Sequence, residues 1–199
     1  KTEWYFKPGG DESTEKEFYE DGVLKSETKY KGGQMDGASK KYDESGRMES
    51  EKNYTGGKKS GTDRKYTYFD SGKVKTEKSF KNGREDGVSK EYFEDGKVSS
   101  ETNYKDGLEE GVSRGYYEGG QVRYERRYRE GREHGMSKEY FENGQVEFEE
   151  NYENGKQDGI SRQFYPKGEI KMVTVYKKGD KVSMKKYDRT GKVTAEEEY

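Results

Sequence analysis

The chain has 199 residues, of which only 25% are hydrophobic while 41% are charged. This composition excludes an ordinary globular domain, which devotes nearly half of its residues to apolar types. The lack of cysteine excludes disulfides, thiol catalysis and cysteine-based metal sites. The charges nearly cancel at −2, which gives no general reason to bind nucleic acid or an anionic membrane. An aromatic content of 14% argues against disorder, because aromatic side chains supply large burial energies. We therefore expect a folded chain with a thin core.

Glycine recurs along the chain with a period of 24 residues, as between Gly120 and Gly144. One step is longer, at 26 residues between Gly46 and Gly72, and the last step is 23 residues. Self-similarity at a fixed period is typical of repeat architectures, in which each unit packs on its neighbours. We predict a single array over residues 1–199 with about eight units. The first unit, at about 1–13, and the last unit, at about 180–199, are irregular.

Within each unit the pattern predicts a β-hairpin. In one clear unit a strand at Ser89–Phe93 leads into Asp95-Gly96, and a second strand follows at 98–104. Asp-Gly between two β-prone runs favours a two-residue type I′ turn. In chain order, the predicted turns lie at residues 21–22, 45–46, 71–72, 95–96, 119–120, 143–144 and 167–168. The fold class predicted is all-β: an elongated, solenoid-like antiparallel sheet built from tandem 24-residue hairpins.

A two-residue turn at Asp95-Gly96 fixes the cross-strand partners. It places Phe93 opposite Val98 and Lys90 opposite Glu101. The same charge pair recurs as Lys40–Glu51, Arg114–Glu125 and Lys138–Glu149. Directly opposed opposite charges contribute roughly 0.2–1 kcal/mol per pair, so a structural role explains this column.

Catalytic chemistry is not indicated. His134 is the only histidine, and it lies in a predicted turn without a nucleophile–base set around it. The glutamates that recur once per unit all have a basic partner, whereas acid–base catalysis needs carboxyls that differ from one another. The segment 56–62 lacks the residue order of a phosphate-binding loop. We therefore expect no enzyme activity, no cofactor and no bound metal.

The repeat resembles a known family. The stretch 148–168 is similar to the MORN repeat (membrane occupation and recognition nexus), with Tyr152-Glu-Asn-Gly-Lys-Gln-Asp-Gly159 close to the Tyr-x-Asn-Gly-Lys-x-x-Gly of a bacterial variant found in YwqK-type antitoxins. The resemblance runs from about Phe6 to Tyr199. Glu150, where the classical repeat has a glycine, is one of several departures that weaken the case for membrane binding.

The resemblance implies a non-enzymatic scaffold that mediates protein–protein interaction, including antitoxin- or immunity-like roles. A structural or cell-surface spacer is the alternative, and phosphoinositide or membrane-surface binding is a weaker one that the balanced charge disfavours. We expect a monomer with a protein partner, and neither nucleic acid nor a membrane as ligand. The expected location is the bacterial cytoplasm, or the cell surface after removal of an export signal.

One position of the repeat, which forms a column when the units are aligned, changes from polar to apolar residues along the chain. It holds Ser or Thr at positions 26, 50, 76 and 100, but Tyr124, Phe148 and Met172 in later units. Strict alternation places Tyr117, Phe141, Tyr165, Val122, Val146 and Ile170 on the same face. This apolar patch is either curled into a core or an interface, since contiguous exposed patches mark binding sites. The candidate partner-binding residues are Tyr117, Tyr124, Phe141, Phe148, Tyr165 and Met172.

Overall fold

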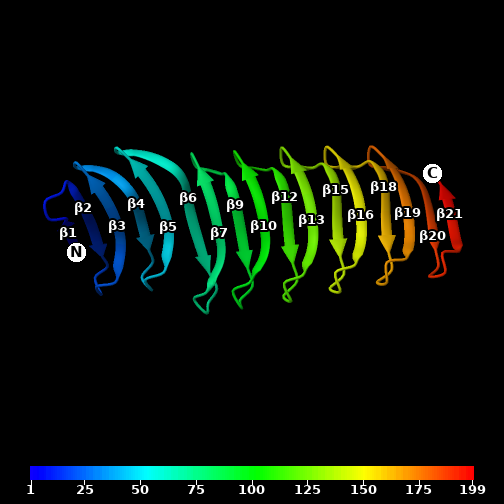
Figure 1. Cartoon of the computed structure of the whole chain (residues 1–199), viewed down its shortest axis with the longest axis horizontal. Coiled ribbons are helices and arrows are strands. Elements are labelled where there is room, and N and C mark those ends of the chain that lie inside the picture. Colours follow the sequence, from blue (N-terminus) through cyan, green and yellow to red (C-terminus); the bar gives the residue numbers. More distant parts are fainter. The chain divides into compact units, whose positions relative to one another are not determined.

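The computed structural model describes residues 1–199 and contains only β-strands, turns and bends, which confirms the all-β fold class. The strands form one open antiparallel sheet of 21 strands, arranged as tandem hairpins. Figure 1 shows the strands following one another in chain order. The chain divides into two compact units, Lys1–Ser89 and Lys90–Tyr199, and each is described by itself below.

The strands of the first unit are β1 (Thr2–Phe6), β2 (Glu12–Phe18), β3 (Leu24–Lys31), β4 (Gln34–Tyr42), β5 (Met48–Thr55), β6 (Lys58–Tyr68), β7 (Val74–Lys81) and β8 (Arg84–Glu85), with β9 (Gly87–Tyr92) beginning at its end. Those of the second unit are β10 (Val98–Lys105), β11 (Leu108–Glu109), β12 (Gly111–Tyr116), β13 (Val122–Arg129), β14 (Arg132–Glu133), β15 (Gly135–Tyr140), β16 (Val146–Glu153), β17 (Lys156–Gln157), β18 (Gly159–Phe164), β19 (Ile170–Lys177), β20 (Asp180–Tyr187) and β21 (Val193–Glu198).

The prediction of a two-residue type I′ turn at Asp95-Gly96 is wrong. Phe93 N–H donates to Lys97 O at 2.8 Å and Gly96 N–H donates to Phe93 O at 2.9 Å, so the loop is one residue longer. Gly96 has φ of 93°, whereas Asp95 does not have a positive φ. The Asp95 carboxylate instead accepts a hydrogen bond from Lys97 N–H at 2.9 Å. Asp is favoured at this position because its carboxylate accepts a hydrogen bond from the turn backbone, and not because it adopts a left-handed conformation.

The type I′ turns lie in the connections between hairpins. Asn154 and Gly155 both have positive φ, at 54° and 80°, and the closing pair is Glu153 opposite Lys156. The same arrangement recurs at residues 82–83, 106–107, 130–131 and 178–179. Asn and Gly adopt this conformation most readily, because the left-handed region is closed to most residues with a Cβ.

The predicted charge pairs are confirmed. Arg114 and Lys138 lie opposite Glu125 and Glu149, with N–O distances of 2.9 Å in both pairs. The Lys90–Glu101 pair measures 2.9 Å and the Lys40–Glu51 pair 3.9 Å. The basic and acidic residues also alternate across neighbouring hairpins, since Glu125 lies opposite Lys138 and Glu149 opposite Arg162.

A β-bulge in each hairpin changes the predicted faces. Gly115 lies opposite Tyr124, but the next pair is Tyr116 with Val122, so one residue of β13 is left unpaired. The shift moves Val122 to the face opposite that of Tyr124. The prediction that Val122, Val146 and Ile170 share a face with Tyr124 is therefore wrong, because strict alternation does not hold across a bulge.

The two faces of the sheet differ in burial. We call the face that carries Ser113, Tyr124 and Tyr128 the inner face, and the face that carries Arg114 and Glu125 the outer face. Small residues in the middle of the inner face are buried: Thr28, Ser89, Ser113, Ser137 and Thr174. No second layer covers them within either unit, so the strands must curve toward the inner face to bury this row.

The turn chemistry gives a prediction about stability. Glu130 occupies the left-handed position that Asn154 occupies one repeat later, with φ of 50°. Changing Glu130 to Asn is expected to stabilise the chain by about 0.5–1 kcal/mol, because Asn tolerates this conformation better than Glu. The reverse change, Asn154→Glu, should destabilise it by a similar amount. Urea denaturation of the two variants measures both effects, and equal stabilities would contradict the turn assignment.

Candidate functional site

Three of the six predicted binding residues form one row on the inner face of the second unit. Tyr124, Phe148 and Met172 lie on alternate strands, so their backbones are roughly 9–10 Å apart. The residues between and beside them in the row are Gly115, Glu139, Gln163 and Lys186. All three apolar side chains are half-buried. The row is therefore a mixed surface, in which apolar groups alternate with polar groups.

The other three predicted residues, Tyr117, Phe141 and Tyr165, lie at the turns within successive hairpins. The Tyr117 hydroxyl donates to Tyr140 O at 2.6 Å, and the Tyr165 hydroxyl donates to Tyr187 O at 3.0 Å. Tyr19 makes the same bond in the first unit, to Tyr42 O at 2.7 Å. These tyrosines join each turn to the following hairpin, so their conformation has a structural cause that sequence reasoning missed.

Gly115 makes room for the first aromatic of the row. A Cβ at this position would lie 2.2 Å from Cε1 of Tyr124, so the tyrosine ring lies directly over the glycine. Arg126, two residues farther along β13, places its guanidinium 4.7 Å from the centroid of the same ring. Cation–π contacts of this kind hold an aromatic side chain in one orientation. The ring is thus fixed by a glycine on one side and a cation on the other.

A polar pocket of about 230 Å³ lies beside this row on the inner face. It is lined by Arg126, Glu133, Ser137, Glu139, Phe148, Glu150 and Tyr152. The Arg126 guanidinium donates to Glu139 at 2.9 Å and lies 3.8 Å from Glu133. Glu150 accepts hydrogen bonds from Tyr152 at 2.9 Å and from Gln157 at 2.8 Å. Three carboxylates and one guanidinium give the pocket a net negative charge.

Sequence reasoning missed this pocket, although a signal was present. Arg126 and Glu150 stand in a column that holds Thr102 before them and Thr174 after them. Threonine in this column is part of the buried row, as Thr174 shows with 3% exposure. Replacing it by longer charged residues in two consecutive repeats opens the row and brings charge to the inner face.

Burial perturbs the ionisable groups of the pocket. Desolvation raises the pKa of Glu133 above its usual value, and Glu150 and Glu139 add to the rise while Arg126 opposes it. Desolvation alone would lower the pKa of Arg126, but hydrogen bonds with Glu139 and Tyr128 raise it overall. The pKa of Tyr152 is raised by desolvation and by its hydrogen bond to Glu150. Glu133 is therefore a carboxylate that lacks full compensation for its charge.

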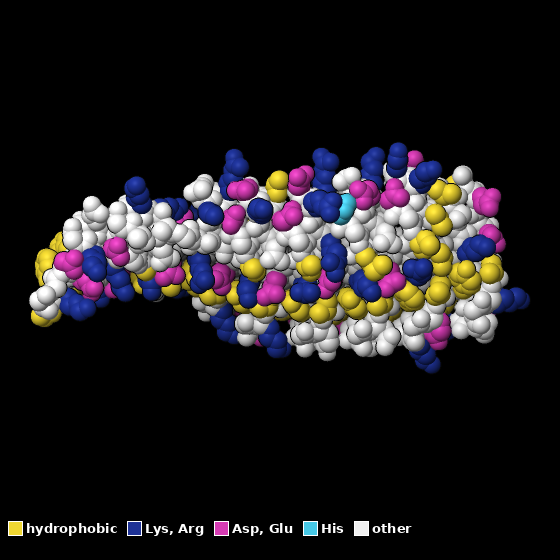
Figure 2. Space-filling view, turned by 45° about the horizontal axis from the view of Figure 1, so that its top comes forward, with side chains coloured by type: hydrophobic (Ala, Val, Ile, Leu, Met, Phe, Trp, Pro, Cys, Tyr) yellow, Lys and Arg dark blue, Asp and Glu magenta, His cyan; other side chains and the backbone are white.

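The outer face carries the charge pairs together with exposed apolar side chains, including Met136 and Ile160. In the part of Figure 2 that shows the second unit, hydrophobic side chains gather in a band accompanied by alternating basic and acidic side chains. His134 is half-buried next to the start of β15, with Nδ1 3.6 Å from Glu153.

These observations define a tandem β-hairpin repeat protein with a curved single-layer sheet. Comparison with protein families identifies the repeat: the MORN repeat variant model matches seven segments, at 12–31, 35–55, 65–82, 85–106, 109–130, 133–154 and 157–178. The chain belongs to this family. A comparison with curated proteins found no match.

The family is generally a non-enzymatic repeat scaffold, so a scaffold role follows for this chain. The matched segments begin at residue 12 and end at residue 178, which leaves both ends of the chain outside the repeat model. The structure has no helix of the length and apolar character needed to span a membrane.

The close packing of the Tyr124 ring over Gly115 gives a second prediction. The change Gly115→Ala should cost roughly 1–3 kcal/mol of stability, because the new methyl group displaces the Tyr124 ring from its contact with Arg126. In a Tyr124→Ser background the same change should cost almost nothing. A double-mutant cycle by urea denaturation measures this coupling, and additive effects would show that the ring does not depend on the glycine.

The raised pKa of Glu133 gives a third prediction. Because the folded chain binds this proton more tightly than the unfolded chain, an ionised Glu133 opposes folding at neutral pH. Glu133→Gln should therefore stabilise the chain at pH 7, and the gain should shrink as the pH falls through the raised pKa and disappear below 4.5, the ordinary pKa of the group, where Glu133 is protonated in both states. Arg126 keeps Glu139 as its partner.

The repeat offers a matched reverse change, since Gln157 stands in the position of Glu133 one repeat later. Gln157→Glu should lose stability at pH 7, where the new carboxylate would face Glu150 in place of the present hydrogen bond. Urea denaturation at several pH values measures both variants. A stability gain for Glu133→Gln that did not depend on pH would rule out desolvation as its cause.

Proposed function

We propose that this chain is a protein-binding scaffold and that its partner contacts the inner face of the second unit. The observation that carries the proposal is the row of Tyr124, Phe148 and Met172 beside the acidic pocket. Earlier repeats fold with Ser or Thr in the same column, so the fold does not require these side chains. Half-exposed aromatic and Met side chains are enriched in interfaces.

The pocket defines what the partner should present. A lysine or arginine side chain entering it would meet Glu133, Glu139 and Glu150, with Phe148 and Tyr152 beside its aliphatic stem. Such a cation would compensate the charge of Glu133, which the pocket leaves poorly solvated. The best partner surface is therefore a basic side chain next to apolar ones.

The same electrostatics disfavour an anionic ligand. Phosphate groups of a phosphoinositide or of nucleic acid would approach three carboxylates on the inner face and alternating acids on the outer face. A spacer role would leave the change from Ser to aromatic side chains without a reason. An antitoxin or immunity role is the finer form of the proposal, in which the partner is a toxin protein with the basic and apolar surface described above.

The fourth prediction tests the site directly. Changing both Tyr124 and Phe148 to Ser copies the early repeats, so the chain should still fold, with a loss of stability below about 3 kcal/mol. Recovery of the partner from lysate of the host, measured by quantitative mass spectrometry, should fall at least tenfold relative to the unchanged chain. Circular dichroism and urea denaturation confirm the fold of each bait.

The outer face supplies the matched control. Met136→Ser with Ile160→Ser removes two exposed apolar side chains from the opposite face and should leave partner recovery unchanged. Equal recovery by all three baits would reject the inner face as the binding site. A large loss of stability for the Tyr124 and Phe148 variant, without loss of binding, would assign the row to the core.

A further inference from the structure

The inner face of the first unit carries lysines on four successive strands. We call them the lysine cluster, which consists of Lys41 on β4, Lys52 on β5, Lys65 on β6 and Lys78 on β7. Lys52 lies opposite Ser39, whose hydroxyl bonds to the buried Thr28 of the inner face. Lys41 and Lys65 lie opposite Ser50 from its two sides. Because adjacent strands are about 4.8 Å apart, the cluster extends over roughly 15 Å.

Two lysines of the cluster oppose each other directly. Lys65 pairs with Lys78 in the register of β6 and β7. Like charges directly opposite each other destabilise a sheet. In a regular repeat the position of Lys78 is opposite a serine, as Arg126 is opposite Ser113. The opposed lysines occur in the one repeat that is 26 residues long, so the fold of the other repeats does not need them.

Three lysines of the cluster have no carboxylate partner. Lys78 is paired with Glu85 at 2.6 Å, whereas Lys41, Lys52 and Lys65 form no ion pair. The Lys65 ammonium instead lies 4.8 Å from the centroid of the Phe80 ring. The cluster therefore keeps unpaired positive charge on the inner face.

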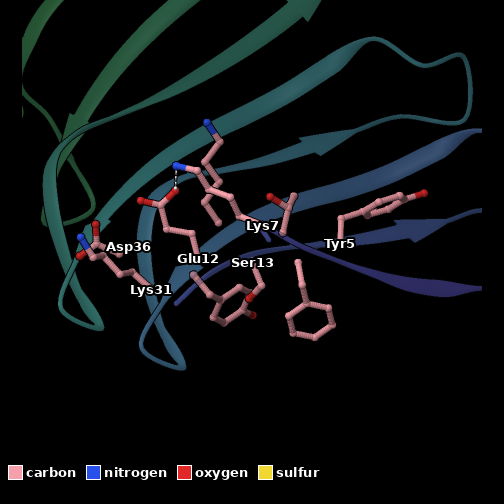
Figure 3. Close-up of a pocket in the computed structure, with 10 residues that line it drawn as sticks. Tyr5, Lys7, Glu12, Ser13, Lys31 and Asp36 are labelled. Carbon is pink, nitrogen blue, oxygen red and sulfur yellow. Dashed lines mark hydrogen bonds and ion pairs between the residues drawn. The ribbon is translucent and has the colours of Figure 1, made fainter. Parts of the chain in front are cut away.

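Elsewhere on the first unit, basic side chains are paired with acidic ones. In another pocket of this unit, Figure 3 shows Lys7 paired with Glu12 at 3.0 Å. On the outer face, Lys40 lies 3.9 Å from Glu51. Unpaired charge thus sets the lysine cluster apart from these surfaces.

A buried carboxylate lies beside the cluster. Asp63 of β6 is 5% exposed and is the only charged residue among the buried residues of the chain. It forms an ion pair with Lys59 and lies opposite Phe80. A buried charge needs compensation, which Lys59 supplies. With Lys59 included, five lysines face the two carboxylates of Asp63 and Glu85, which leaves three positive charges.

We propose that the lysine cluster binds an acidic segment of a partner protein, with carboxylates against Lys41, Lys52 and Lys65. Alternate side chains of an extended segment point the same way at intervals of about 7 Å, which suits lysines spread over neighbouring strands. Such complementarity governs partner choice and association rate more than affinity. The added carboxylates would also relieve the repulsion between Lys65 and Lys78.

Ligands that carry phosphate fit this surface less well. A lone phosphate needs donors that converge on one point, whereas these lysines are spread over four strands. The Asp63 carboxylate would repel a phosphate dianion more strongly than a carboxylate. Single-stranded nucleic acid also stacks its bases on exposed aromatic rings, and Lys65 lies over the ring of Phe80.

The fifth prediction uses a fluorescein-labelled peptide, Gly-Glu-Thr-Glu-Thr-Glu-Gly, as the probe. Fluorescence anisotropy should show saturable binding to the full chain that weakens as salt is added. The same peptide with Gln in place of Glu should not bind. Changing Lys52 to Thr and Lys65 to Gln should weaken binding roughly threefold to thirtyfold, as expected for the loss of two exposed ion pairs.

Both substitutions use residues that the repeat already accepts. Thr102 holds the position of Lys52 in a later repeat. Gln163 lies opposite Phe148 as Lys65 lies opposite Ser50. The variant should therefore fold.

The matched control removes the same charge from outside the cluster. Lys58→Gln with Lys81→Thr copies Gln34 and Thr55 of the preceding repeats. Both lysines lie at the ends of their strands, next to the turns of the first unit. This variant should bind the peptide as the unchanged chain does. Equal weakening by both variants would show that only the total charge matters and would overturn the proposal.

Stability separates binding from a structural role. If the lysines served mainly to compensate Asp63, the Lys52→Thr and Lys65→Gln variant should lose stability in urea and still bind the peptide, which would overturn the proposal. We expect equal or higher stability at low salt, because the opposition of Lys65 and Lys78 is removed.

Other occupants give different results. Tighter binding of a single-stranded oligonucleotide or of anionic vesicles than of the peptide, through the same lysines, would contradict the proposal. Salt-sensitive dimerisation of the chain alone, lost in the lysine variant, would assign the cluster to a second copy and contradict it as well.

The lysine cluster and the inner-face site of the second unit fail separately. The Tyr124→Ser and Phe148→Ser changes should leave the peptide titration unchanged, because every residue of the cluster belongs to the first unit. The proposal for the cluster therefore does not rest on the proposed function.

Discussion

A sheet with no second layer has to bury its inner face by itself, and the rest of this structure depends on that constraint. Met184 is the only hydrophobic residue that is buried, and apart from Gly115 the other buried residues are polar or charged. The hydroxyls of the buried row bond to one another, as Thr28 does with Ser39 at 2.9 Å and Thr102 with Ser113 at 3.0 Å. A chain with 25% hydrophobic residues can therefore fold, because the residues of its buried row are small and several of their hydroxyls are hydrogen-bonded to one another.

The same constraint explains the outer face. Curvature toward the inner face spreads the outer side chains, so the alternating lysines, arginines and glutamates remain solvated while they pair across strands. Exposed pairs contribute little individually, but they oppose every one-residue slip, since a slip would move all charged side chains to the inner face. The repeated pair thus specifies the register that the small buried row alone would leave weakly defined.

The sequence was sufficient to predict the hairpins and the charge pairs, because the 24-residue period and the opposed charges are both local signals. It was insufficient for the turns. Asp and Asn serve both as left-handed residues, as at Asn154, and as side-chain acceptors, as at Asp95, and the Asp-Gly pair is compatible with either role. It was also insufficient for the face of Val122, because nothing in the alternation marks the bulge. The pocket could not be predicted because its residues come from separate strands. Arg126 and Glu139, for example, are 13 positions apart in the sequence.

In a repeat protein, a position that is the same in every unit is explained by the fold that every unit shares. Gly115, Arg126 and Glu150 depart from their columns in the second unit, and Trp4 departs in the first. The fold does not need these departures, because the other repeats form the same hairpins without them. Tyr124 and Phe148 place aromatic rings at a position where the earlier repeats carry Ser or Thr. Gly115 makes room for the Tyr124 ring. The position of Arg126 and Glu150 also holds Lys52 and Lys78 in earlier repeats, so charge at that position is not confined to the second unit. The differences between repeats, and not the repeated residues themselves, are therefore the part of this sequence on which the proposed partner site rests.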